Sequence, residues 1–170
     1  MLFRSLRDFH NIYVKSKLIQ SVAREGGSLF DIAVGKAGDL PKWSRARLGF
    51  VMGMDISKDN IENPFDGACA RYLNAKKRNK NIFKAVFVQG NSALSIRDGK
   101  AITSEQGKHV MTNVFGLTPK NNTNYELLTQ VHGMGRRGFD MVSCQFALHY
   151  FFASKSILDT FIDNVKLCCR

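Results

Sequence analysis

The sequence predicts an α/β fold built on an open, mainly parallel sheet with helices on both faces. Four short apolar runs have the length and composition of buried strands, and segments with helical features separate them. This alternation is typical of parallel sheets, because the next parallel strand is reached through a crossover helix. Right-handed crossovers would bring the carboxyl ends of all four strands to one edge. The expected strands are residues 29–34, 48–55, 84–88 and 139–143.

The composition indicates one domain with a large excess of positive charge. The chain has 170 residues, of which 44% are hydrophobic, enough for a core. Lys+Arg 25 against Asp+Glu 14 gives a net charge of +11, which favours a polyanionic partner such as nucleic acid. The alternative is a basic protein with its charge spread over the surface. No apolar run approaches the roughly 20 residues that span a bilayer, so we expect no membrane association.

The cysteine and histidine spacings match no metal site. The four cysteines form no C-x-x-C pair, and the four histidines show no H-x-x-x-H spacing. Cys144 lies in an apolar run and is expected to be a core thiol. We therefore expect a reduced intracellular protein without a bound metal.

The helices are predicted from apolar periodicity and capping residues. Residues 8–24 form the first, in which Asn11 and Lys15 share one side. Ser57 can cap a helix that breaks at Asn63-Pro64 and resumes near Asp66. Two more helices are expected over residues 104–114 and 154–167, and residues 116–138 read as loop.

The first strand runs into a turn of small residues, Gly35-Lys36-Ala37-Gly38, and Asp39 is expected to cap the helix that follows. A strand that ends in such a turn leaves backbone N–H groups free for a nucleotide-like ligand. The turn is not G-x-G-x-x-G, because Ala33 and Ala37 stand where glycines would be. An ordinary connection between a strand and a helix remains the alternative.

The other strands also end in polar or aromatic residues. Asp55 ends the second strand, 20 residues after Gly35. In nucleotide-binding folds, an acidic residue at this spacing accepts hydrogen bonds from both ribose hydroxyls. Asn91 follows the third strand and offers an amide to the edge of an adenine. The fourth strand is followed by Gln145, Phe146, His149 and Tyr150. Taken singly, Asp55 could be a helix cap and His149 a core histidine. Together these residues favour a nucleoside-bearing cofactor.

The glycine-poor turn favours S-adenosylmethionine over a dinucleotide, because S-adenosylmethionine has no pyrophosphate for the backbone to approach. The second ligand must then accept a methyl group. Basic side chains near the same edge indicate that this acceptor carries phosphates. They are Lys15, Lys36, Lys42 and Arg71.

The chain resembles the mRNA cap guanine-N7 methyltransferases, most closely those of large DNA viruses. The resemblance covers nearly the whole chain, and its most specific part is the Gln-Phe-x-x-His-Tyr spacing within FDMVSCQFALHYFF. The other parts are NIYVKSKLI, DIAVGKAGDLPKW and DISKDNIENPFDGACARY, which begin at Asn11, Asp31 and Asp55.

The resemblance implies a Rossmann-like sheet of the S-adenosylmethionine-dependent methyltransferase type, with about four of the usual seven strands present. It also implies two sets of site residues. The cofactor set is Lys15, Asp31, Ala33, Gly35, Asp55, Asn91, Gln145 and Tyr150. The set for the cap or its RNA is Asn11, Lys36, Lys42, Arg71, Phe146 and His149.

The implied reaction passes a methyl group in line to guanine N7, which already has a free lone pair. No general base is needed, so no residue is assigned as an acid or base and His149 would position guanine. The implied partners are the capped mRNA 5′ end and other capping-enzyme domains or a stimulatory subunit. The compartment would be cytoplasmic for a viral protein and nuclear for a cellular one.

The sequence departs from the family at several positions. Ala33 and Ala37 replace turn glycines, Asn91 stands where Asp is usual, and Ala93 lies where an aromatic would help hold guanine. Members of the family continue beyond the position of Arg170 with three more strands. These strands carry further cap contacts, including an acidic residue that recognises guanine. We therefore expect a single methyltransferase domain over residues 1–170 that represents the N-terminal part of the fold.

Three other functions stay open. One is a methyltransferase for another RNA or a small molecule. Another is a non-catalytic module that binds RNA or the cap. The third, a nicotinamide oxidoreductase, fits least well because the first turn lacks the glycines that a pyrophosphate needs.

Overall fold

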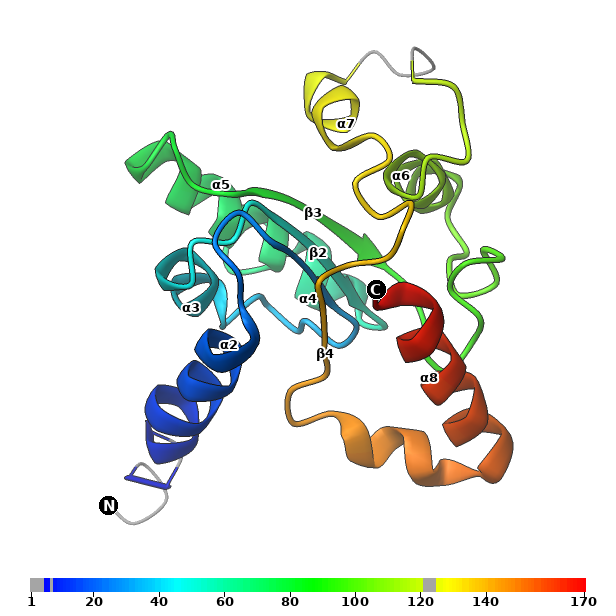
Figure 1. Cartoon of the computed structure of the whole chain (residues 1–170), viewed down its shortest axis with the longest axis horizontal. Helices are drawn as coiled ribbons and strands as arrows, with labels where there is room; N and C mark the ends of the chain where they lie inside the picture. Colours follow the sequence, from blue (N-terminus) through cyan, green and yellow to red (C-terminus); the bar gives the residue numbers. More distant parts are fainter. Residues whose placement is uncertain (1–4, 7, 121–124) are drawn as a thin grey trace.

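The fold is an open, all-parallel α/β sheet (Figure 1). The structure is a computed structural model that describes residues 5, 6, 8–120 and 125–170. Within them, four strands lie in the order β3 (Lys84–Gln89), β2 (Phe50–Asp55), β1 (Ser28–Asp31) and β4 (Met141–Ser143). All three pairings are parallel, which confirms the predicted Rossmann-like sheet.

The strand register places the carboxyl ends of the strands at one edge. Asp31 at the end of β1 pairs with Gly53 on one side and with Ser143 on the other. Asp55 at the end of β2 pairs with Gln89. The first strand is shorter than predicted, since it ends at Asp31, although the Val34 amide still donates to the Met54 carbonyl at 2.9 Å.

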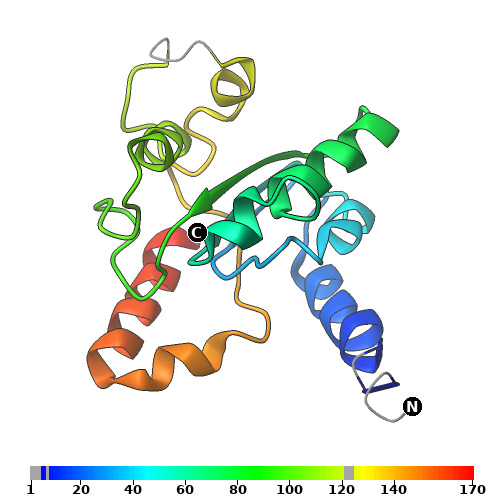
Figure 2. The ribbon, with the colours of Figure 1, turned by 180° about the vertical axis from the view of Figure 1, so that it is seen from behind.

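Two layers of helices cover the sheet. One face carries α2 (Ser16–Val22), α3 (Leu40–Arg45), α4 (Lys58–Glu62) and α5 (Ala68–Arg78), of which α4 and α5 are seen from behind in Figure 2. The other face carries α6 (Glu105–Val114), α7 (Glu126–Val131) and α8 (Lys155–Cys168).

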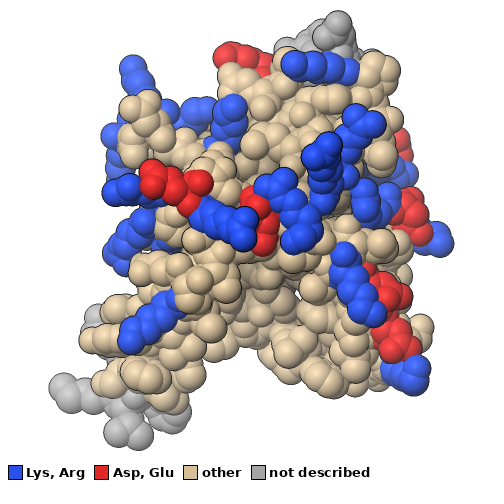
Figure 3. Space-filling model, in the orientation of Figure 1, with Lys and Arg blue, Asp and Glu red and all other residues tan. Residues whose placement is uncertain are grey.

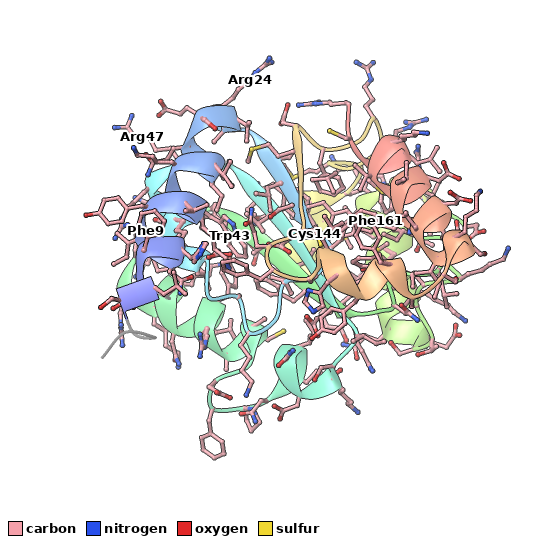
Figure 4. The ribbon with its side chains drawn as sticks, turned by 90° about the horizontal axis from the view of Figure 1, so that it is seen from below. Phe9, Arg24, Trp43, Arg47, Cys144 and Phe161 are labelled. Atoms are coloured by element: carbon pink, nitrogen blue, oxygen red, sulfur yellow. The ribbon has the colours of Figure 1, made fainter. Side chains whose placement is uncertain are left out.

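The two layers are separated because successive strand side chains point to opposite faces. Val51 packs in the cluster of the first layer, whereas Met52 packs in the cluster of the second. Trp43 and Phe161 lie inside the molecule on these two sides (Figure 4). A core on both faces of the sheet explains why the strands read as continuous apolar runs.

Most predicted helices are present, and the predicted cap at Ser57 is confirmed. The Ser57, Ser104 and Ser154 side chains each accept a hydrogen bond from the backbone of the first turn of α4, α6 and α8. The break after α4 at Asn63 is also confirmed, and α5 begins at Ala68.

Other local expectations are corrected by the structure. The first helix is a π-helix, η1 (Phe9–Lys15), followed by α2. The Asp39 side chain makes no capping bond to α3, because ion pairs occupy it. The loop expected over 116–138 contains α7, and a 3₁₀ helix, η2 (Leu148–Ala153), follows β4. Both elements are six residues long, too short to show a helical period.

The last residues run beside the beginning of β4. The Phe139 amide donates to the Cys168 carbonyl at 2.6 Å, and the Arg170 amide donates to the Phe139 carbonyl at 3.0 Å. Phe139 and Cys169 form an isolated parallel bridge. Within the described residues, no helix is both long and apolar enough to cross a membrane.

Candidate functional site at the carboxyl edge of the sheet

A cavity of about 400 Å³ lies at the carboxyl edge of the sheet, and we call it the carboxyl-edge cavity. Four separate segments form its wall. They are Ile32 and Ala33 after β1, residues 55–57 with Asn60 after β2, residues 90–93 after β3, and Ala147, Tyr150 and Phe151 beyond β4.

Asp55 ties the first turn to the second strand. Its Oδ2 accepts from the Gly35 amide at 2.8 Å, and its Oδ1 accepts from the Ser57 amide at 2.9 Å and from Asn60 Nδ2 at 3.0 Å. Gly35 has a φ of +55°, which glycine adopts without strain. An ionised carboxylate has about four acceptor positions, so Asp55 keeps room for about one further donor.

Asn91 begins the segment that forms the third part of the wall. Its Oδ1 accepts from the Ala93 amide at 3.0 Å, and its own amide donates to the Ala101 carbonyl at 2.8 Å. Gly90 precedes it at a position where neighbouring side chains approach the backbone closely. A Cβ there would lie 2.5 Å from Ile102 Cδ1 and 2.6 Å from Met54 Sδ.

Asn164 of α8 holds this wall segment from behind. Its Nδ2 donates to the Ser92 carbonyl at 2.9 Å and to the Leu94 carbonyl at 2.8 Å, and its Oδ1 accepts from the Ile96 amide at 3.0 Å. Asn164 is not among the residues predicted from the sequence. The available signal was a polar amide at a core position of α8, between the buried Phe161 and Cys168.

Asp31 lies below the cavity at the end of β1 and is only 2% exposed. Its Oδ1 accepts from the Ala33 amide at 3.2 Å. Burial raises the pKa of this carboxyl to about 7, and the Ala33 hydrogen bond opposes the shift. Asp31 therefore supports the wall residue Ala33 from below and does not itself line the cavity.

Asp39 joins two of the predicted basic residues. Its Oδ2 lies 3.1 Å from Lys15 Nζ and its Oδ1 lies 2.7 Å from Lys42 Nζ. The Lys42 side chain is only 11% exposed, so this amine is directed into the protein. Lys15 Nζ also lies 4.7 Å from the centre of the Phe146 ring, which links η1 to the segment after β4.

Lys36 and Arg71 differ in their pairing. Lys36 Nζ lies 2.8 Å from an Asp66 carboxylate oxygen and 3.1 Å from an Asp59 oxygen. Hydrogen bonds to Asp66 and then to Asp59 raise the pKa of Lys36. Arg71 on α5 is exposed, and within the described residues no carboxylate forms an ion pair with it.

The segment after β4 is mostly exposed. Phe146 is 59% exposed at a φ of +61°, and Tyr150 is 69% exposed with its ring 4.0 Å from that of His149. His10 of η1 packs edge-on against Phe146 at 5.6 Å. Gln145 is half-buried and lies outside the cavity wall.

The structure thus brings four of the predicted cofactor residues to one cavity. Ala33, Asp55, Asn91 and Tyr150 line it, Gly35 is bonded to Asp55, and Gln145 is not brought in. Asn11 lies on η1 beside His10. Sequence reasoning also missed Ser57, Asn60 and Ser92 as wall residues.

The cysteines show no features of a reactive or metal site. All four are free, and burial raises the pKa of Cys144 to about 11, so its thiol stays protonated near neutral pH. Within the residues that the structure describes, no group of three or more His, Cys, Asp or Glu could hold a metal ion.

Sequence comparisons with known proteins indicate the same protein family. The model of the mRNA (guanine-N(7))-methyltransferase domain matches residues 3–170. A probable mRNA-capping enzyme of Acanthamoeba polyphaga mimivirus is 28% identical over 95% of this chain and 12% of its own length. An mRNA cap guanine-N(7) methyltransferase of Oryza sativa subsp. japonica is 28% identical over 94% of this chain and 34% of its own length.

A solved structure shows the same fold. The YcgJ protein from Bacillus subtilis matches 95% of this chain and 46% of its own chain with a TM-score of 0.50 at 14% identity. The present chain spans 12% and 34% of the lengths of the two relatives named above. Because the family model matches residues 3–170, the chain belongs to the mRNA (guanine-N(7))-methyltransferase domain family.

Proposed function

We propose that this chain transfers a methyl group from S-adenosylmethionine to N7 of the guanosine cap of mRNA. Family membership supports the reaction class. The observation that carries the proposal is the convergence of Asp55 and Asn91, from separate strands, on the carboxyl-edge cavity.

The residues of the cavity fit an adenosine. Its volume of about 400 Å³ lies in the range of small-molecule sites, and its wall combines apolar side chains such as Ile32 and Phe151 with several polar ones. Gly90 lets the backbone approach closely. The free acceptor position of Asp55 suits one ribose hydroxyl, one fewer than the sequence alone suggested.

Asn91 would contact the adenine edge. The Ala93 amide already uses one lone pair of Oδ1, so a second lone pair and the Nδ2 donors remain. An amide can therefore donate to a ring nitrogen as well as accept from the adenine amine. Without the charge of Asp, each of these hydrogen bonds is weaker.

When bound, S-adenosylmethionine supplies an electrophilic methyl group on a sulfonium. Guanine N7 has a free lone pair, so no residue has to remove a proton. The protein contributes orientation and proximity, effects that supply on the order of 7–11 kcal/mol in favourable cases. We assign His149, Phe146 and Asn11 to guanine positioning, since their segments meet beside Lys15.

The cap phosphates would meet Arg71 and Lys36. Arg71 is exposed and free of ion pairs with the described carboxylates, so its guanidinium can bind phosphate directly. A phosphate that binds Lys36 has to compete with Asp66 and Asp59. Lys42 is directed to Asp39, so we expect it to hold the turn rather than the ligand.

The test combines cofactor titration with a methyl-transfer assay. Calorimetric titration of S-adenosylmethionine should give binding to the wild type and at least ~100-fold weaker binding to Asp55→Ala, the loss expected for a charge-assisted hydrogen bond and its supporting contacts. Asp59→Ala is the matched control, because Asp59 is a nearby carboxylate outside the cavity wall. Methyl transfer should occur to GpppA and not to uncapped RNA.

Two results would contradict the proposal. Equal cofactor affinity of the wild type and Asp55→Ala would remove the cavity as the adenosine site. Transfer to uncapped RNA with none to GpppA would instead favour a methyltransferase of different specificity.

A further inference from the structure

The amino-terminal edge of the sheet, opposite the carboxyl-edge cavity, carries a concentration of exposed positive charge. Figure 3 shows Lys and Arg side chains in a row across the middle of the molecule, with few carboxylates among them. Arg24 and Arg47 point away from the protein body in Figure 4. We call the cations of this edge the basic band: Arg24, Arg47, Lys84, Arg97, Arg136, Arg137 and Arg170.

Backbone contacts join the segments that carry the basic band. The Gly27 amide donates to the Arg24 carbonyl at 2.9 Å, and the Gly49 amide donates to the Gly27 carbonyl at 2.8 Å. The Lys84 amide donates to the Gly49 carbonyl at 3.1 Å. These contacts hold the first residue of β3 beside the segments that precede β1 and β2.

The second half of the basic band is joined in the same way. Arg97 donates from Nη2 to the Arg136 carbonyl at 3.3 Å and from Nη1 to the Leu167 carbonyl at 3.2 Å. Asp140 bonds the Ser28 amide at 2.7 Å and Arg170 Nη2 at 2.6 Å. The fold therefore gathers cations from segments that are far apart in the sequence.

The charges of the two edges differ in their pairing. At the carboxyl edge, Lys15, Lys36 and Lys42 are all held by carboxylates. In the basic band, within the described residues, ion pairs hold Arg47 through the exposed Glu25 and Arg170 through Asp140. The other five cations have no ion-pair partner there.

We propose that the basic band binds the phosphate backbone of the RNA that follows the cap, at a site separate from the carboxyl-edge cavity. The proposal rests on the proposed function, because that function brings RNA to the protein. Arginines predominate in the band, and their planar guanidinium groups match phosphate oxygens. The band lies roughly 20 Å from the cavity, the length of a six-residue strand such as β2.

The test removes three unpaired charges of the basic band. The triple variant Arg24→Ala, Arg136→Ala, Arg137→Ala leaves no carboxylate without its partner. The matched control is Lys17→Ala, Lys77→Ala, Lys120→Ala, which removes three exposed lysines outside the band that form no ion pair within the described residues. Binding of an uncapped single-stranded RNA of about 20 nucleotides is measured between low and physiological salt.

We expect the band variant to lower the slope of log K against log salt by about two, and the affinity at low salt by roughly 10-fold or more. The control should keep the wild-type slope. Cofactor titration and the KM for the short substrate GpppA should be unchanged in the band variant, while the KM for a capped 20-mer should rise. This pattern separates the band from the cavity.

An unchanged slope in the band variant, or an equal loss in the control, would overturn the proposal. Retained RNA binding with lost binding to phosphatidylserine vesicles would also overturn it, because the partner would then be a membrane surface. If the wild type binds RNA through the band but shows neither cofactor binding nor methyl transfer, the RNA site stands and the proposed function falls.

Discussion

The two walls of the carboxyl-edge cavity differ in how firmly the protein holds them. The wall from β1, β2 and β3 is fixed by hydrogen bonds, because Asp55 accepts three and Asn164 makes three. The segment after β4 is held by ring contacts, and its Phe146 and Tyr150 are more than half exposed.

This difference bears on the proposed function, because the two proposed ligands would meet parts of the site that are held with different firmness. The first wall, which we assign to the cofactor, is preformed and so loses little conformational entropy on binding. The segment after β4 carries Phe146 and His149, which we propose to position the cap, and both side chains are exposed and so have room to adjust. Four predictions test this contrast, in order of decreasing expected effect.

The largest effect concerns Asp31, below the first wall. Its pKa of about 7 in the folded protein lies above the unfolded value of 3.8, so the folded state binds the extra proton between these pH values. The free energy of unfolding should therefore fall as pH rises from about 4 to about 7, by roughly 4 kcal/mol from this group. Asp31→Asn should lack this component, as measured by urea unfolding at pH 4 and pH 8. The prediction would be contradicted if the free energy of unfolding changed equally with pH in both proteins, because Asp31 would then already be ionised at pH 5 in the folded state.

The second prediction concerns the brace behind the first wall. Asn164→Ala removes three hydrogen bonds and leaves two carbonyls and one amide without their partner. We expect a loss of about 2–3 kcal/mol in the free energy of unfolding and weaker cofactor binding. Chemical denaturation and calorimetry measure the two effects. Asn113→Ala is a suitable control, since Asn113 is equally buried but makes no side-chain hydrogen bond within the described residues.

The third prediction concerns the close approach at Gly90. Gly90→Ala should cost about 1–3 kcal/mol of stability, because its Cβ would overlap Ile102 and Met54 and would lie 3.0 Å from the Ala101 carbonyl. Cofactor affinity should fall with it, since the wall has to move. Gly38→Ala is the control, because nothing lies within 4 Å of a Cβ there. Equal thermal midpoints for the two variants would mean that the wall yields easily.

The smallest effect on stability is expected in the second wall. Phe146→Gly loses the contacts with Lys15 and His10, together worth about 1–2 kcal/mol, but relieves a left-handed backbone that costs a non-glycine residue about 1–2 kcal/mol. The thermal midpoint should therefore stay nearly constant while the KM for GpppA rises. A large drop in the midpoint would show that this wall is as firmly held as the first.

The sequence by itself determined the class of fold and the place of the site. Buried strands separated by capped helices can pair in parallel only through crossovers, so the carboxyl ends of the strands had to share an edge. The convergence of Asp55 and Asn91 follows from that rule. The cap at Ser57 follows equally, because a cap involves residues only three positions apart.

Only the tertiary structure decided how each polar group is used. The sequence indicated Lys36 and Lys42 as phosphate-binding residues. In the structure, however, they form ion pairs with Asp66 and Asp39. Asn164, 72 residues from Ser92, braces a wall that no local pattern connects to it. The physical reason is range: sequence patterns fix neighbours within a turn or a strand, whereas an ion pair or a buried amide is satisfied by whichever group the packed chain places within about 3 Å.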